Sequence, residues 1–398
     1  MNQGARIKAM AAPVTGRVTR AVEVATPYWT RGSAGRETPP ELVRILYTWW
    51  LVAFALKVLG ASWDVSWHFK WLRDDLAPPH LLNSVGTAIV VALVIVHAYT
   101  GYGVDRVAQR LIQWGTGLFL VAVPLDLINH RVNGLDITSW SPSHMLLYIG
   151  TAFMIAGVIR GWYVSAPAGR GRPIILGAFF VYFLENVLFP SEHQEYGVLE
   201  LASWDRGTPY AEPSLINFAA EQMGRAVDRV MVAKFSLPVP DWVYPMWYGV
   251  AAVLVLVVAR KLVGRRWTAT AVAGVYVAYR AIIWPLLVLG GFPPSAVPFF
   301  LVVAAICVDV AFLIPWPAAR ALLGTALATA GVYGGLLAQD RILEAPPFLL
   351  ASAPITAALV AATWLAFEWY HSRTPRRRGV LAPAPEPTPA PETDPITS

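Results

Sequence analysis

Long apolar runs alternate with short polar segments along almost the whole chain. Most of these runs approach or exceed the about 18 residues that a membrane-crossing helix needs, and the segments between them hold most of the charged side chains. The pattern predicts an all-α, polytopic integral membrane protein. Ten transmembrane helices are predicted, at residues 43–61, 81–100, 108–128, 144–163, 173–190, 243–260, 267–289, 296–315, 318–337 and 348–368.

Composition supports this class. Hydrophobic residues make up 56% of the 398 residues and charged residues only 14%, whereas a soluble chain carries about 25% charged residues. The single cysteine, Cys307, excludes disulfides within the chain and cysteine-rich metal sites. Residues 1–40 are polar and basic without a short apolar core, so no secretory signal peptide is expected.

The distribution of basic residues predicts an orientation. Of the 31 Lys and Arg, 21 lie in the segments that face inside if the N-terminus is inside, eight lie in the opposite segments and two lie within spans. By the positive-inside rule both termini are predicted to be cytoplasmic, in a bacterial cytoplasmic membrane. The basic and then Pro-rich tail is predicted to be disordered, and its charges are interpreted as a topology signal or contact with lipid, not as nucleic-acid binding.

Four regions follow from the pattern. They are a basic N-terminal segment, 1–42; a tandem repeat, 43–163; a six-helix membrane region, 164–371, with an outer loop at 191–242; and the tail, 372–398.

The tandem repeat is defined by polar residues at matching intervals. Both copies fit D-x3-H-x5-D-x(3 or 5)-P-x-H-x-L-x3-G-T-A, with Asp64, His68, Asp74 and His80 in one copy and Asp126, His130, Asp136 and His144 in the other. Each copy contains a helix, a loop on the outer side and a second helix. Units of two helices keep the same orientation, so the copies are predicted to be related by an axis along the membrane normal.

The spacing in each copy favours metal binding. The first Asp and His are four residues apart, on one face of a helix, and the second His follows a proline suited to begin the next helix. Each copy thereby offers one carboxylate and two imidazoles, a donor set for Cu(II), Fe(II) or Zn(II) that leaves positions open. Asp74 and Asp136 are candidates to orient the rings or to act as ligands. The alternative is structural: Asp and His at helix ends also cap helices or bond to each other.

Four further polar residues are candidates for roles near or within the spans. Glu185 and His193 are placed toward the outer ends, as groups that would hold the metal ligands in position or as possible ligands, although His193 also fits a solvated loop. Arg280 and Asp309 are predicted to form an intramembrane pair, because ionisable groups in lipid are costly and tend to pair.

The sequences at Asp64/His68/His80 and Asp126/His130/His144 resemble a known motif. D-x3-H followed by a second His is similar to the intramembrane copper motif in the C subunit of particulate methane and ammonia monooxygenases; here 11 and 13 residues separate the two His. The likeness covers residues 64–88 and 126–152, and the duplication and the larger number of spans differ from that subunit. W-D-x2-W-H and W-S-P-x-H elements also resemble those of uncharacterised polytopic bacterial and archaeal membrane proteins.

The resemblance implies copper, with iron or zinc as alternatives, and oxygen chemistry on a small apolar substrate near the outer face. It also implies partner membrane subunits or an electron donor, within a lipid bilayer. We therefore expect a copper-dependent oxidoreductase of the monooxygenase kind. Two alternatives stay open: a transporter or metal-handling protein that uses the Asp/His cluster as a transit site, and a structural or assembly subunit.

Overall fold

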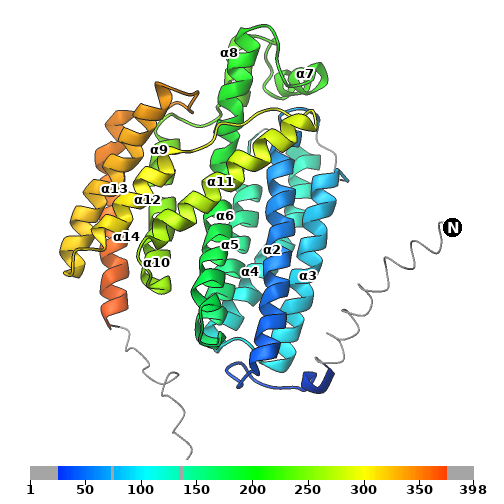
Figure 1. The fold of residues 1–398 in the computed structure, drawn as a ribbon. Coiled ribbons are helices and arrows are strands. Elements are labelled where there is room, and N and C mark those ends of the chain that lie inside the picture. The colour runs from blue at the N-terminus through cyan, green and yellow to red at the C-terminus, as the bar shows by residue number, and fades with distance from the viewer. Residues whose placement is uncertain (1–25, 73–75, 134–137, 374–398) are drawn as a thin grey trace, which may run out of the picture.

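The computed structural model describes residues 26–72, 76–133 and 138–373 (Figure 1). Asp74, Asp136 and almost all of the predicted tail lie outside the described residues, so the predictions made for them are not addressed below.

The described part of the chain is all-helical and contains no strand, as predicted. Nine of its helices are long and apolar enough to cross a membrane. They are α2 (Pro40–His68), α3 (Pro78–Thr100), α4 (Arg106–Asn133), α5 (Pro142–Ser165), α6 (Gly171–Asp205), the continuous stretch of α9 (Val243–Trp247), the π turn η2 (Tyr248–Ala252) and α10 (Val253–Val263), α11 (Thr268–Leu289), α13 (Pro317–Asp340), and η3 (Leu350–Ser352) with α14 (Ala353–Arg373).

The eighth predicted span, 296–315, is shorter than the sequence pattern indicated. Helix α12 covers only Phe300–Ala311, because residues 292–298 are extended and contain Pro293, Pro294 and Pro298. Proline lacks the backbone N–H that a helix interior requires. The extended segment packs into the protein instead, where the Ala296 N–H donates to the carbonyl of Glu195 at 2.9 Å.

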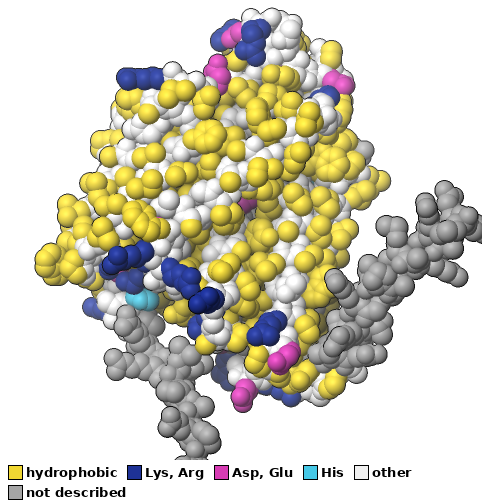
Figure 2. Space-filling model, viewed as in Figure 1, with side chains coloured by type: hydrophobic (Ala, Val, Ile, Leu, Met, Phe, Trp, Pro, Cys, Tyr) yellow, Lys and Arg dark blue, Asp and Glu magenta, His cyan; other side chains and the backbone are white. Residues whose placement is uncertain are grey.

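The helices form a bundle with α6 near its centre (Figure 1). Two antiparallel hairpins, α2–α3 and α4–α5, lie on one side of α6, and α10 to α14 lie mainly on the other. On the face in Figure 2, apolar side chains cover a broad belt, while most charged side chains gather at its two ends. This distribution suits a molecule that is surrounded by lipid at mid-height.

Small residues let the two helices of each hairpin approach closely, in the same way in both copies. A Cβ added at Gly86 would lie 2.8 Å from the Ala53 carbonyl oxygen, and one added at Gly150 would lie 2.9 Å from that of Gly115. These residues occupy matching repeat positions.

The two hairpins also contact each other at equivalent positions. Lys57 and Phe119 match each other in the repeat, and the Lys57 ammonium lies 3.9 Å from the centre of the Phe119 ring. A contact between equivalent positions is what a local two-fold axis between the hairpins produces.

The region predicted as the outer loop 191–242 is largely helical, which corrects that prediction. Helix α6 does not end at residue 190 but continues through Pro190 to Asp205, and α7 (Pro213–Gln222) and α8 (Arg229–Ser236) follow. The 35 residues of α6 span about 52 Å, more than the ~30 Å of a bilayer core. Gly197 allows α8 to pack here, since a Cβ would lie 1.7 Å from the Ser236 carbonyl oxygen.

Candidate metal sites

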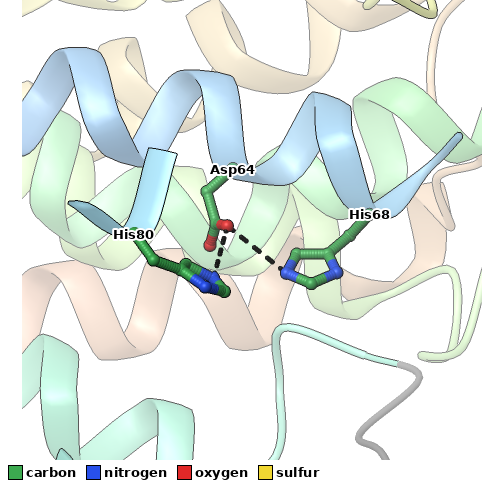
Figure 3. A group of neighbouring side chains, drawn as sticks. All are labelled: Asp64, His68 and His80. Carbon is green, nitrogen blue, oxygen red and sulfur yellow. Dashed lines mark ion pairs between the residues drawn. The ribbon is translucent and has the colours of Figure 1, made fainter. Parts of the chain in front are cut away.

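The first Asp/His group is assembled by the end of α2 and the start of α3 (Figure 3). Asp64 and His68 lie one turn apart on α2, and His80 is the third residue of α3, after Pro78 and Pro79. Asp64 Oδ1 lies 3.3 Å from His68 Nε2 and 2.8 Å from His80 Nε2. The two imidazoles thus turn the same ring nitrogen toward one carboxylate oxygen.

The second group repeats this arrangement on α4 and α5. Asp126 Oδ1 lies 3.5 Å from His130 Nε2 and 3.6 Å from His144 Nε2. Ser141 caps the N-terminus of α5, because its side chain accepts the His144 backbone N–H, which fixes the start of the helix that carries this ligand candidate. In both groups the three potential ligand atoms lie within 4.8 Å of one another, so each could hold a metal ion.

The spacing within the groups fits coordination of one ion. Two donors that each lie about 2.1 Å from a metal, at tetrahedral or octahedral angles, are roughly 3.0–3.4 Å apart. The four Asp–His separations, 2.8, 3.3, 3.5 and 3.6 Å, lie around that range. Asp64 Oδ1 is itself a buried oxygen atom that faces both imidazoles. The residues present therefore fit a metal with nitrogen and oxygen ligands.

The tautomer of His144 gives a further indication. Its Nδ1 lies 3.1 Å from the carbonyl oxygen of Thr138, which can only accept, so Nδ1 carries the proton. In a neutral ring Nε2 then presents a lone pair to Asp126 Oδ1, 3.6 Å away. The repulsion between this lone pair and the carboxylate is relieved either by a proton on Nε2 or by a metal ion bound to both atoms. A backbone carbonyl that holds the distal ring N–H is also the usual support for a metal-binding histidine.

Helix α6 lies between the two groups and contacts the segments that carry them. Ser139, before α5, donates to the Pro190 carbonyl at 3.0 Å, and the Phe69 ring, next to His68, packs 4.8 Å from the His193 ring. His193 interacts electrostatically with both His68 and His144. The two groups therefore flank the same turn of α6.

His193 and Glu185 belong to neither group. The His193 ring is buried and its Nε2 lies 2.9 Å from the Phe235 carbonyl oxygen, so it is not the solvated loop residue that the sequence suggested. Glu185 accepts from the Ser62 hydroxyl at 3.2 Å, two residues before Asp64, which places it near the first group without a contact to it. Glu185 and His193 therefore contact residues next to the candidate ligands, Ser62 and Phe69.

The predicted pair of Arg280 with Asp309 is wrong. Asp309 pairs with Arg260 at 2.9 Å, whereas Arg280 contacts Glu192 and lies 3.0 Å from Glu195. Sequence order placed Arg280 and Asp309 on neighbouring spans, but which faces of those spans meet depends on the packing of α6 and α11.

One polar residue near the second group, Gln194, was not proposed as a site residue from the sequence. The Trp140 indole N–H donates to the side-chain oxygen of Gln194 at 3.3 Å, which connects the loop before α5 to α6. A signal was present, since Gln194 lies in the polar run Ser191-Glu-His-Gln-Glu195 within an apolar region. Gln194 was overlooked because this run was predicted to lie in a loop.

Comparisons of the chain with family models, with curated proteins and with solved structures returned no match. The chemistry of the two Asp/His groups is accordingly argued from their own residues.

Proposed function

We propose that this chain is a membrane metalloprotein in which each Asp/His/His group binds one ion, and that the ion is copper. The observation that supports this most directly is that, in each group, two imidazole nitrogens and one carboxylate oxygen lie within 4.8 Å of one another. Two imidazoles and one carboxylate suit Cu(II), and they also suit Fe(II) and Zn(II).

We further propose that the bound metal serves an oxidoreductase reaction on a small apolar substrate. Copper held by three protein ligands would supply one-electron redox chemistry at a position open to oxygen or substrate. The chain's own contribution would be to orient the imidazoles and to surround them with apolar groups. The resemblance of both groups to the copper motif of the monooxygenase C subunit supports this direction, and partner subunits or an electron donor would then be required.

A metal-handling or transport role is the second candidate, and the exposure of the first group favours it. The side chains of Asp64, His68 and His80 are 27%, 33% and 22% exposed, so an ion can reach them from outside the protein. A transit site has to release its ion, and partial solvation makes release easier.

Metal analysis of the purified protein separates these proposals. Wild type should retain about two copper ions through dialysis and give a Cu(II) paramagnetic resonance signal with nitrogen coupling, since each group has two imidazoles. Redox cycling of that signal by an oxidant and a reductant would support the oxidoreductase. Bound metal that exchanges freely with added isotope would favour transport. Retention of no metal by wild type would contradict both proposals.

A further inference from the structure

A second buried polar cluster lies where α6 packs against α11, apart from the Asp/His groups. Glu185, Glu192 and Glu195 on α6 are at most 2% exposed, and Arg280 on α11 is 1% exposed. The guanidinium contacts Glu192 through Nη1, and its Nη2 lies 3.0 Å from Glu195 Oε2. Three carboxyl groups thus share one cation.

The charges of this cluster do not balance if every group is ionised. Three carboxylates and one guanidinium carry a net charge of −2, and no other Lys or Arg in the described residues forms an ion pair with Glu185, Glu192 or Glu195. Uncompensated charge inside a membrane protein is costly, and buried carboxyl groups take up protons to avoid it.

Glu195 is the best compensated of the three carboxyl groups. Besides Arg280, it receives hydrogen bonds from the hydroxyl groups of Tyr244 at 3.0 Å and Tyr248 at 2.6 Å. Tyr248 begins the π turn η2, a rare distortion that is frequent at functional sites. Three donors on one carboxylate stabilise its charge.

Glu185 and Glu192 are in a different situation. They lie about two helical turns apart on α6, and of the two it is Glu192 that contacts Arg280. An ionised carboxylate only accepts hydrogen bonds. Glu185 Oε1 accepts from the Ser62 hydroxyl, but neither Glu185 Oε2 nor Glu192 Oε2 receives a hydrogen bond from the protein.

Tyr276 provides an independent observation. This residue lies one turn before Arg280 on α11, it is fully buried, and its hydroxyl has no hydrogen-bond partner. It interacts electrostatically with Arg280 and with all three glutamates. Tyr276 thus adds a second kind of buried polar group with unused hydrogen-bonding capacity to the cluster.

We propose that Glu185 and Glu192 together bind an exchangeable proton, beside the compensated pair of Arg280 and Glu195. The proton would exchange through Ser62 and the half-buried Tyr279, whose hydroxyl lies 2.8 Å from Ser62 Oγ. This proton-binding site goes beyond the proposed metal chemistry and does not depend on it. The protein interior would then contain a group whose charge depends on pH.

Infrared spectroscopy of the purified protein tests the proposal, because a protonated carboxyl group has a C=O stretch separate from that of a carboxylate. We expect this band in wild type at neutral pH, with a shift in D2O that reports exchange. Glu185→Gln and Glu192→Gln should each remove it. Glu368→Gln is the matched control: Glu368 is also buried, but it pairs with Lys261 and Arg320, both at 2.9 Å, so the band should stay.

Further variants keep the test decisive. Glu185→Asp keeps an acid at the site and should keep a band at a shifted frequency, even if the Gln variants fold poorly. Arg280→Gln removes the cation, so the cluster should bind a further proton and the band should grow. The His68→Ala/His130→Ala protein should keep the band whatever its metal content. Absence of the band in wild type, or its persistence in both Gln variants, would overturn the proposal.

Discussion

The two Asp/His groups have the same donors but different surroundings. In the first, the carboxylate side chain of Asp64 is 27% exposed and that of His68 is 33% exposed. In the second, Asp126 is 6% exposed and His130 only 4%. The repeated spacing determines which atoms meet, whereas the packing of the neighbouring elements determines how much water reaches them.

This difference gives the two sites different expected properties. A carboxylate that water reaches keeps much of its hydration, while a buried one depends on its protein or metal partners. We expect the second group to bind its ion more firmly and to tolerate loss of a donor less well. Each of the following variants tests whether the two copies behave alike or differ.

The largest expected effect is on metal content. His68→Ala and His130→Ala should each lose about half of the bound ions, and the double variant should lose nearly all of them, because the six side chains form two groups, not one. Elemental analysis after dialysis measures this, with His97→Ala as control; His97 is buried but bonds to Trp50 and the Tyr102 carbonyl. Full metal retention in the double variant would contradict the assignment of these histidines as metal ligands.

These groups could be predicted from the sequence because the interactions that build them are local. Asp64 and His68 are one helical turn apart, and a hairpin returns His80 to the same end of the bundle. The buried cluster at Arg280 could not be predicted, since it depends on how helices far apart in sequence pack. The extent of α6 was missed because its polar run and Pro190 resemble the start of a loop, although burial beneath α8 keeps it helical.

The next effect tests whether the two hairpins are equivalent in packing. Gly86→Ala and Gly150→Ala should each destabilise the protein by about 1–3 kcal/mol, because each new Cβ meets backbone of the partner helix at 2.8 Å. Gly117→Ala, where nothing lies within 4 Å of the new Cβ, should be neutral or stabilising by up to ~1 kcal/mol. Thermal unfolding in detergent measures all three. Two equally neutral variants at Gly86 and Gly150 would contradict the close packing.

A smaller effect is expected when each carboxylate is replaced in metal-free protein. Asp126→Asn should cost about 1–3 kcal/mol of unfolding free energy, because the buried His130 imidazole loses an ionised partner that water cannot replace. Asp64→Asn should cost less, since the Asp64 side chain is 27% exposed and that of Asp126 is only 6% exposed. Unfolding after chelation compares the two. An equal cost at both positions would show that exposure does not distinguish the groups.

The smallest effect concerns pH, and it compares the sites one at a time. His130→Ala leaves only the first site intact, and His68→Ala leaves only the second. Imidazole binds metal only when neutral, and free His has a pKa near ~6.5, so occupancy of both sites should fall as pH drops through roughly 6 to 5. The second site is the less exposed of the two, so we expect it to keep its ion to a lower pH, with midpoints differing by less than about one unit.

Two results would contradict this expectation. Each site has two imidazoles, so occupancy should fall more steeply than one proton per ion allows, and His80→Gln and His144→Gln should weaken binding and flatten the curve at their own sites. Occupancy that stays constant down to about pH 4 would show that imidazoles are not the ligands. A first site that outlasts the second would show that solvent exposure does not control proton competition here. The matching Asp and His of the two copies would then be better explained by hydrogen bonds that hold the ends of the hairpins together.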